Sequence, residues 1–300
     1  MFDRQTLQGA YFALSAYLFW GIAPVYFKWL GHVSPFEIVA QRVIWSTVLL
    51  LGILLVMGRL DTLRLARQQW WKIVCTSALL TFNWLVFVYS IATNNIAESS
   101  LGYFINPLVS VFLGMLFLGE RLRPLQWIAI TIAAAGILIQ LLYFGRIPFL
   151  ALALAFSFGF YGLMRKNLGL HAVGGLALET LIMLPVALAW LGWLWSQDLL
   201  QFAHVDFRTD LLLVAAGLVT SFPLLCFAAA VRRLSLTAAG MFQYVSPTLS
   251  LLLAVFVYGE PFDASRMVVF GCIWLALAIF TFETVVFHRR LRRRLRGEAL

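Results

Sequence analysis

Long apolar segments separated by short polar gaps occupy almost the whole of the 300-residue chain. The hydrocarbon core of a bilayer is about 30 Å thick, and about 20 helical residues cross it. Ten such segments can be placed along the sequence, at residues 9–30, 35–57, 71–93, 98–118, 125–144, 147–164, 174–196, 210–231, 237–258 and 265–287. Because the apolar runs are continuous and do not alternate, each predicts a membrane-spanning helix and not a barrel strand.

The composition supports an all-α membrane protein. The chain is 62% hydrophobic and only 12% charged, which leaves too few polar residues to cover a soluble globule. Its three cysteines, Cys75, Cys226 and Cys272, all fall inside apolar segments, where we expect small packing residues. We expect no metal site and no cofactor from this pattern.

The basic residues predict the orientation of the chain in the membrane. With the N-terminus in the cytoplasm, the outside gaps hold only four of the 22 lysines and arginines, namely Lys28, Arg146, Arg208 and Arg266. Arg42 lies within a span, and the remaining 17 fall on the cytoplasmic side. The positive-inside rule therefore predicts that both termini are cytoplasmic. This placement of charge argues against nucleic-acid binding, and the basic tail at 289–300 is expected to hold anionic lipid headgroups.

The two halves of the sequence resemble each other. An offset of 140 residues aligns Pro107 with Pro247 and Ser110 with Ser250, while an offset of 138 aligns Gly21 with Gly159. These matches predict a duplication, with a first five-helix repeat at 1–145, a second at 146–288 and the tail at 289–300.

Five spans in each half make the two repeats inverted in the membrane, because the second half enters from the opposite side. Inverted repeats are typical of transporters that work by alternating access, with the solute held near the midplane between the halves. The predicted fold is therefore ten transmembrane helices in two inverted-topology repeats, and the predicted function is transport.

Polar residues inside two repeat-equivalent spans are candidates for lining a central cavity. Tyr103 and Asn106 share one helical face, and Gln243 occupies the position equivalent to Tyr103, next to Tyr244. Pro107 and Pro247 follow directly and are expected to kink their helices. The alternative is that these polar groups only join helices to each other at packing contacts.

Arg42 is the most costly side chain in the predicted spans, because an arginine at a helix centre costs about 2.5–3.5 kcal/mol on insertion scales. Glu179 is its obvious counter-charge, yet the helical rise places the two on opposite sides of the midplane. We therefore expect Arg42 to bond neighbouring carbonyls or an acidic group of a solute, and Glu179 to act separately on the inner side. Structural pairing remains an alternative for each.

Three further residues complete the predicted substrate cavity. Asn83 lies in the third span, and Trp20 and Tyr161 could stack on a planar or cationic ligand. Aromatic residues in membrane proteins also form interfacial belts, so lipid contact is the alternative for Trp20 and Tyr161.

Several of these segments resemble a known family. Residues 17–24, 41–46, 100–108, 116–121 and 242–248 resemble the RarD-type proteins of the EamA family, in the drug/metabolite transporter superfamily. The family often has His where this chain has Gln41. The resemblance implies a ten-helix bundle of inverted repeats with a central cavity, acting as an inner-membrane permease, often an exporter, of amino acids and small metabolites.

The sequence thus predicts a secondary transporter of a small, amino-acid-like solute in the bacterial inner membrane, as a monomer or weak dimer. It contains no Gly-x-x-x-x-Gly-Lys-Ser/Thr motif, so ATP is not the direct driver. A channel or a membrane sensor is the alternative. An intramembrane enzyme is disfavoured, because all four histidines fall in gaps or at span ends.

Overall fold

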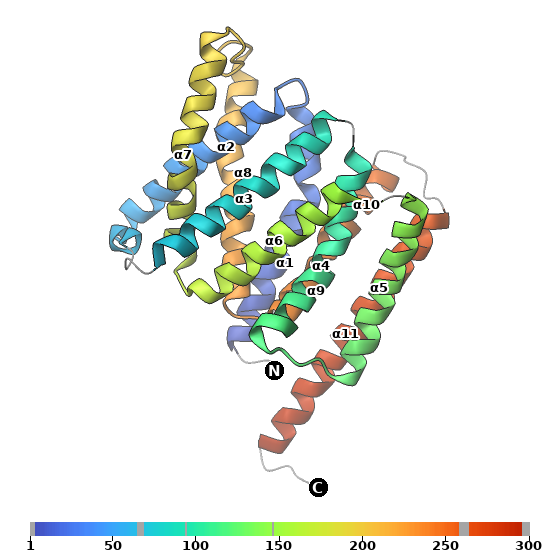
Figure 1. The fold of residues 1–300 in the computed structure, drawn as a ribbon. Helices are drawn as coiled ribbons and strands as arrows, with labels where there is room; N and C mark the ends of the chain where they lie inside the picture. Colours follow the sequence, from blue (N-terminus) through green and yellow to red (C-terminus); the bar gives the residue numbers. More distant parts are fainter. Residues whose placement is uncertain (1–3, 65–68, 94, 146, 258–263, 296–300) are drawn as a thin grey trace.

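The computed structural model describes every residue except 1–3, 65–68, 94, 146, 258–263 and 296–300 (Figure 1). Helices make up nearly all of this described part, and no strand occurs in it. The elements are α1 Arg4–Trp29, α2 Pro35–Val56, the short 3-10 helix η1 Leu60–Leu63, α3 Trp70–Ala92, α4 Ile96–Leu118, α5 Pro124–Phe144, α6 Phe149–Leu168, α7 Ala172–Ser196, α8 Phe207–Val231, α9 Leu236–Phe242, α10 Val245–Phe256 and α11 Ala264–Leu295.

Ten segments of the described chain are long and apolar enough to cross a membrane, as the hydrophobic pattern predicts. The α9 and α10 helices together form one of them. The predicted spans agree with the observed helices to within a few residues at most ends. The largest departures are the start of α1 at Arg4 and the end of α11 at Leu295. The sixth span also runs past its predicted end, because α6 continues to Leu168 and places Arg165 and Lys166, expected in a cytoplasmic gap, inside the helix.

Local sequence signals explain several helix ends. Gly119, Gly145 and Gly169 end α4, α5 and α6 with positive φ angles between 63° and 71°, a conformation that glycine adopts without steric cost. At the start of α8, the Asp206 carboxylate accepts a hydrogen bond from the Thr209 amide at 2.6 Å and caps the helix.

The two halves interlock, so most helix contacts run between repeats and not within them. The α2 helix packs on α7, α5 on α11 and α4 on α9, which pairs each helix with its own counterpart. The packing of α1 on α8 is matched by that of α6 on α3, and α4 on α6 is matched by α10 on α1. Exchanging the halves therefore reproduces the contact pattern, as expected of inverted repeats. The match is incomplete, because α2 packs more extensively on α8 than α7 does on α3, and α6 contacts α8 more than α1 contacts α3.

A glycine allows the two central helices to approach closely. A Cβ atom on Gly240 of α9 would lie only 3.0 Å from the Pro107 carbonyl oxygen of α4 and 2.9 Å from the Ser110 side chain. Any larger residue would separate the helices at this crossing.

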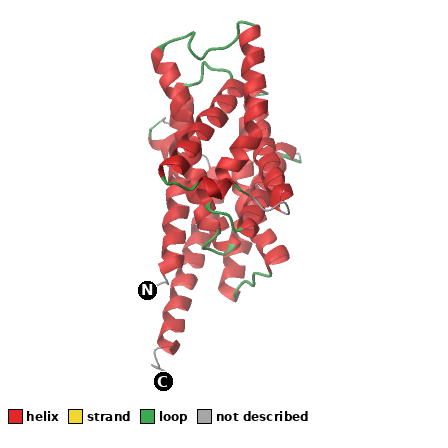
Figure 2. Cartoon of the chain, turned by 90° about the vertical axis from the view of Figure 1, so that its left-hand side faces the viewer, coloured by secondary structure: helices red, strands yellow, loops and turns green. Residues whose placement is uncertain are grey.

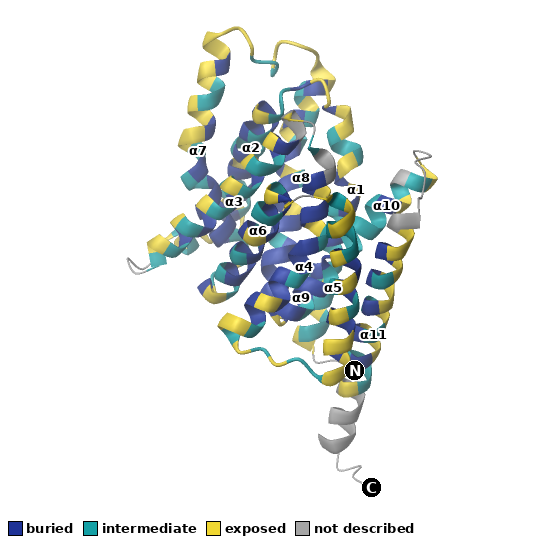
Figure 3. Cartoon of the chain, turned by 45° about the vertical axis from the view of Figure 1, so that its right-hand side comes forward, coloured by how far each residue is buried: buried dark blue, intermediate teal, exposed yellow. Residues whose placement is uncertain are grey.

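The molecule is an elongated bundle with distinct ends. Helix α1 begins and α11 ends at one end, which we call the terminal end, and the loop between α7 and α8 lies at the opposite, far end (Figures 1 and 2). Buried residues gather in the middle of the bundle, and exposed residues lie on the outward faces and at the ends (Figure 3). Many of the exposed residues are large and apolar, such as Val56 and Phe256, as expected of surfaces in contact with lipid.

Candidate solute pathway

Arg42 on α2 lies in the far half of the bundle and interacts with neutral groups. Its Nε donates a hydrogen bond to the Thr220 hydroxyl of α8 at 2.7 Å. Its guanidinium carbon lies 4.6 Å from the centre of the Trp84 ring and 5.3 Å from that of Phe27. Such contacts each recover about 0.5–2 kcal/mol of the cost of holding the charge away from water.

The positive charge of Arg42 has no acidic partner among the residues that the structure describes, where the ion pairs involve other side chains. Its side chain remains partly exposed. Tyr103 of α4, which is 47% exposed, and Tyr26 of α1 are two phenols close to Arg42. This part of the protein therefore holds a cation of intermediate burial, with phenols from two other helices nearby, at membrane depth.

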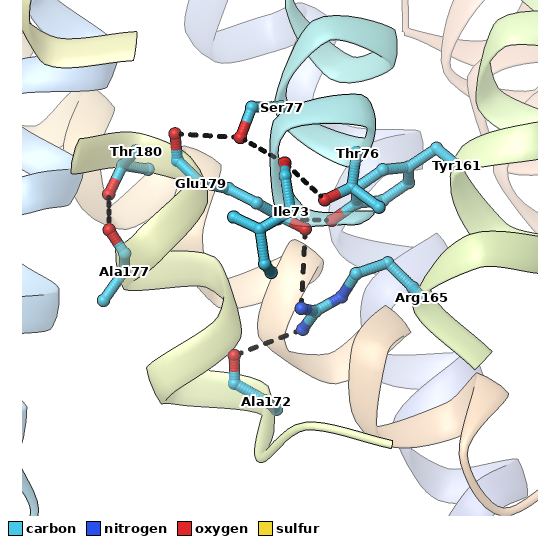
Figure 4. A network of polar contacts seen from close by, with 9 residues as sticks. All are labelled: Ile73, Thr76, Ser77, Tyr161, Arg165, Ala172, Ala177, Glu179 and Thr180. Carbon is cyan, nitrogen blue, oxygen red and sulfur yellow. Dashed lines mark hydrogen bonds and ion pairs between the residues drawn. The ribbon is translucent and has the colours of Figure 1, made fainter. Parts of the chain in front are cut away.

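A second arginine, in the terminal half, is buried and takes part in the polar network drawn in Figure 4. Arg165 of α6 pairs with Glu179 of α7, with Nη1 and Oε1 3.4 Å apart and side chains that are 2% and 0% exposed. The Tyr161 hydroxyl donates to the other Glu179 oxygen at 3.1 Å, and the Thr76 hydroxyl lies within hydrogen-bonding reach of the carboxylate. Glu179 thus pairs with Arg165 and not with Arg42.

An aromatic cluster connects the bundle's centre to this ion pair. Tyr161 stacks on Phe227 with ring centres 6.0 Å apart, and Phe158 contacts both rings. Trp20 contacts Phe158 and Phe227 as well and packs against this cluster. With Tyr161 and Phe227 almost fully buried, this cluster closes the centre of the bundle in the observed conformation.

The polar residues predicted to line the cavity from the fourth and ninth spans lie in two environments. Asn106 and Gln243 are buried, while Tyr103 is half exposed. Gln243 donates to the Ser110 hydroxyl of α4 at 3.1 Å and so joins the two repeats. The Tyr17 hydroxyl faces Gln243 as well, yet Tyr17 Oη and Gln243 Oε1 complete no hydrogen bond of standard geometry.

Unpartnered polar atoms mark this junction between the repeats. Asn106 Oδ1 and the Tyr244 hydroxyl are buried without hydrogen-bond partners, like Tyr17 Oη and Gln243 Oε1. Because buried polar groups are normally paired, unpaired capacity in several neighbouring helices leaves room for an ordered water, for a ligand or for a conformational change that pairs these groups.

Asn83 lies between α3 and α6 and is engaged there. Its amide nitrogen donates to the Leu154 carbonyl at 3.0 Å and to the Ser157 hydroxyl at 2.9 Å. The amide therefore helps to pack the two helices in this conformation, which is the role that interhelical polar groups commonly have in membranes.

The two prolines have different surroundings. Helix α4 is continuous through Pro107, whereas the span that contains Pro247 is divided at Gln243 and Tyr244 into α9 and α10. Proline has no amide hydrogen to donate to the carbonyl four residues earlier, and at Gln243 that carbonyl accepts from the Ser246 amide instead, at 3.2 Å.

Three residues that contact the candidate site residues are not identified from the sequence, namely Arg165, Thr220 and Tyr17. The hydrophobic pattern assigns Arg165 to a gap, because basic residues usually mark the ends of spans. The alignment of the repeats gives no hint either, since the position equivalent to Arg165 in the first repeat is Phe27. Thr220 and Tyr17 give weaker signals, because a single threonine or tyrosine is common in membrane helices. A search for acids and bases on adjacent helices near Glu179 would have found Arg165.

A shallow apolar hollow on the outer surface contains none of these residues. It lies between α3 and α6, measures about 450 Å³ and is lined by Cys75, Ala78, Leu79, Phe82, Phe160 and Met164.

Two interlocked five-span halves with polar side chains at their junction define a class, the multi-pass membrane transporters built from inverted repeats. Family comparison agrees, since the model of the EamA-like transporter family matches residues 7–142 and again 146–282. The chain belongs to the EamA-like transporter family, and it is a membrane transporter protein of the RarD type.

Relatives cover nearly the full length. The chain is 49% identical to an uncharacterized transporter of Vibrio cholerae, with 97% of each chain covered. It is 46% identical to protein RarD of Escherichia coli, with 96% of this chain and 98% of the relative covered. A protein of Pseudomonas aeruginosa named chloramphenicol-sensitive protein RarD is 31% identical, with 96% and 98% covered.

A solved crystal structure shares the fold. It superimposes with a TM-score of 0.71 at 21% sequence identity, over 93% of this chain and 97% of the other. At that level of identity the likeness concerns the fold alone, and it supports the arrangement of ten helices in two repeats.

Proposed function

We propose that the protein is a secondary transporter that moves a small amino-acid-like solute by alternating access. The observation that carries the proposal is Arg42, a partly exposed cation at membrane depth that forms no ion pair within the described chain. A membrane protein keeps such a costly group where its charge is used. The carboxylate of a solute is the partner that its neutral surroundings lack.

The residues around Arg42 suit the rest of such a solute. Trp84 and Phe27 offer apolar ring faces beside the guanidinium, and Tyr103 offers a hydroxyl. Asn106, Gln243 and Tyr244 hold buried polar atoms without partners, which an amino group or a conformational change would satisfy. We therefore assign Arg42 to the solute carboxylate and this junction to the remaining polar groups.

The proposed orientation places the terminal end in the cytoplasm, as the distribution of Lys and Arg predicts. The arginine-rich residues after the last span then meet the cytoplasmic leaflet and hold anionic lipids. Arg42 faces the outside in this arrangement, and the aromatic cluster separates it from the cytoplasm.

Counterflow in proteoliposomes tests the proposal. Vesicles preloaded with an unlabelled L-amino acid should accumulate the labelled form transiently, for at least one member of a panel of L-amino acids. Arg42→Gln, confirmed folded by its melting temperature, should abolish that accumulation. An ohmic current in place of counterflow would show a channel, and the absence of both for every amino acid would contradict the proposed substrate class.

A further inference from the structure

The alignment of the repeats relates the two arginine sites. The offset that places Gln41 on Glu179 also places Phe27 on Arg165 and Arg42 on Thr180. In the first repeat, the guanidinium comes from the second helix and faces Phe27. In the second repeat, it comes from the first helix and faces Glu179, beside Thr180. Each repeat therefore holds one guanidinium between equivalent helices, in opposite halves of the bundle.

The Arg165–Glu179 pair is incompletely bonded for a pair so deeply buried. Arg165 Nε and Nη1 and Glu179 Oε1 are buried without a hydrogen bond, and the ion pair spans 3.4 Å. Arg165 Nη2 reaches the Ala172 carbonyl only at 3.4 Å. A permanent structural pair offsets its desolvation through short, bidentate bonds. This pair leaves most of the guanidinium's donors unused.

The α7 helix has a glycine, Gly175, where the Arg165 guanidinium packs against it. A Cβ atom on Gly175 would collide with Arg165 Nη1, so any other residue there would displace the charged group. Other cations lie close to this end of the pathway. Burial and the nearby Arg232, Arg59 and Arg233 lower the pKa of His171, the residue that precedes α7. The same positive field favours an anion at Arg165.

We propose that Arg165 is a second anion-binding site of the pathway, which takes the solute carboxylate when the terminal end opens, and that Glu179 is its built-in substitute anion. Glu179 occupies the guanidinium while that end is closed and gives way to the solute carboxylate by exchange of ion pairs. The exchange keeps Arg165 paired with a carboxylate throughout, and the released Glu179 carboxylate meets the water that enters when the terminal end opens. This inference rests on the proposed function.

Rescue by acetate tests the site without any knowledge of the solute. Glu179→Ala should lower the melting temperature of the purified protein, and sodium acetate should restore more than half of the loss relative to sodium chloride at equal ionic strength. The double variant Arg165→Gln/Glu179→Ala should show no acetate-specific gain. Equal responses of the single and double variants, or no response of the single variant, would overturn the proposal.

A second variant covers the case in which Glu179→Ala does not fold. Glu179→Gln removes the substitute anion with little change of shape, so the panel member that wild type transports should bind about tenfold more tightly. The corresponding amine, which lacks the carboxylate, should show no gain. Glu37→Gln is the matched control, since Glu37 is equally buried but accepts backbone amides of the far-end loop, at Gln201 and Phe202.

The outcomes separate this inference from the proposed function. Unchanged or weaker carboxylate binding by Glu179→Gln, or an equal gain in Glu37→Gln, would overturn the second site while leaving transport in place. If wild type binds no member of the panel, the proposed substrate class fails, and the acetate experiment still decides whether Arg165 accepts an external carboxylate.

Discussion

The two arginine sites use the same chemical group in equivalent parts of the repeats, yet their surroundings differ in one decisive respect. Arg165 is sealed and balanced by Glu179, whereas Arg42 is partly exposed and meets only a hydroxyl and ring faces. Among the described residues, Arg165 therefore has an acidic partner and Arg42 has none. The difference supports the proposal that the far half accepts the solute in this conformation.

Breaking the sealed pair should have the largest effect. Arg165→Gln leaves the Glu179 carboxylate buried without its partner, which costs about 3–5 kcal/mol of unfolding free energy. Arg165→Gln/Glu179→Gln should recover most of that loss, because it removes both charges. Thermal unfolding in detergent measures this, and equal destabilisation by the single and double variants would show that the two side chains are not coupled.

Removing the exposed cation should affect transport and not folding. Arg42→Gln leaves no carboxylate unpaired in the described chain, so its melting temperature should stay close to that of wild type. Loss of a charged hydrogen bond to the solute, about 2 kcal/mol, corresponds to about 30-fold weaker solute binding. Counterflow and unfolding are measured on the same preparation, and a variant that unfolds while wild type does not would make Arg42 structural.

Two tyrosines sharpen the contrast between the sites. Tyr161→Phe removes the hydroxyl that bonds Glu179 and should cost about 1.5–3 kcal/mol of stability, as expected of a hydrogen bond to a charged group. Tyr103→Phe, at the half-exposed position near Arg42, should leave stability unchanged. Urea or thermal unfolding of the two variants side by side checks this, and similar losses would remove the distinction.

The smallest effect is expected at an ion pair outside both sites. Arg123 donates to Glu283 at 2.7 Å and joins α5 to α11, but its side chain is 30% exposed, so solvent screens the interaction. Arg123→Gln/Glu283→Gln should change stability by less than about 1 kcal/mol and leave counterflow intact. A loss of transport here would mean that any ion pair between the repeats matters, and not the arginine sites in particular.

The fold was largely predictable because lipid imposes a length on each apolar run, and the repeat was visible from rare residues such as Pro107 and Pro247. Arg42 and Glu179 could also be singled out, since the free-energy cost of burying a side chain in the membrane depends on the residue type and is high for charged groups. Their partners could not. The position of Arg165 depends on where α6 ends, which the basic residues themselves obscured. The contact of Arg42 with Thr220 depends on how α2 meets α8, which no local pattern encodes.

Sided labelling of two single-cysteine variants tests the central claim most directly. In a background without Cys75, Cys226 and Cys272, Tyr103→Cys reports on the far half and Ser77→Cys, which lies beside Glu179, reports on the terminal half. With a membrane-impermeant maleimide, the Tyr103→Cys variant should react only from outside. The Ser77→Cys variant should react only from the cytoplasm, and only when transport conditions open that end. Labelling of both variants from the same side would contradict the account, because it would show a continuous passage instead of two sites reached in turn.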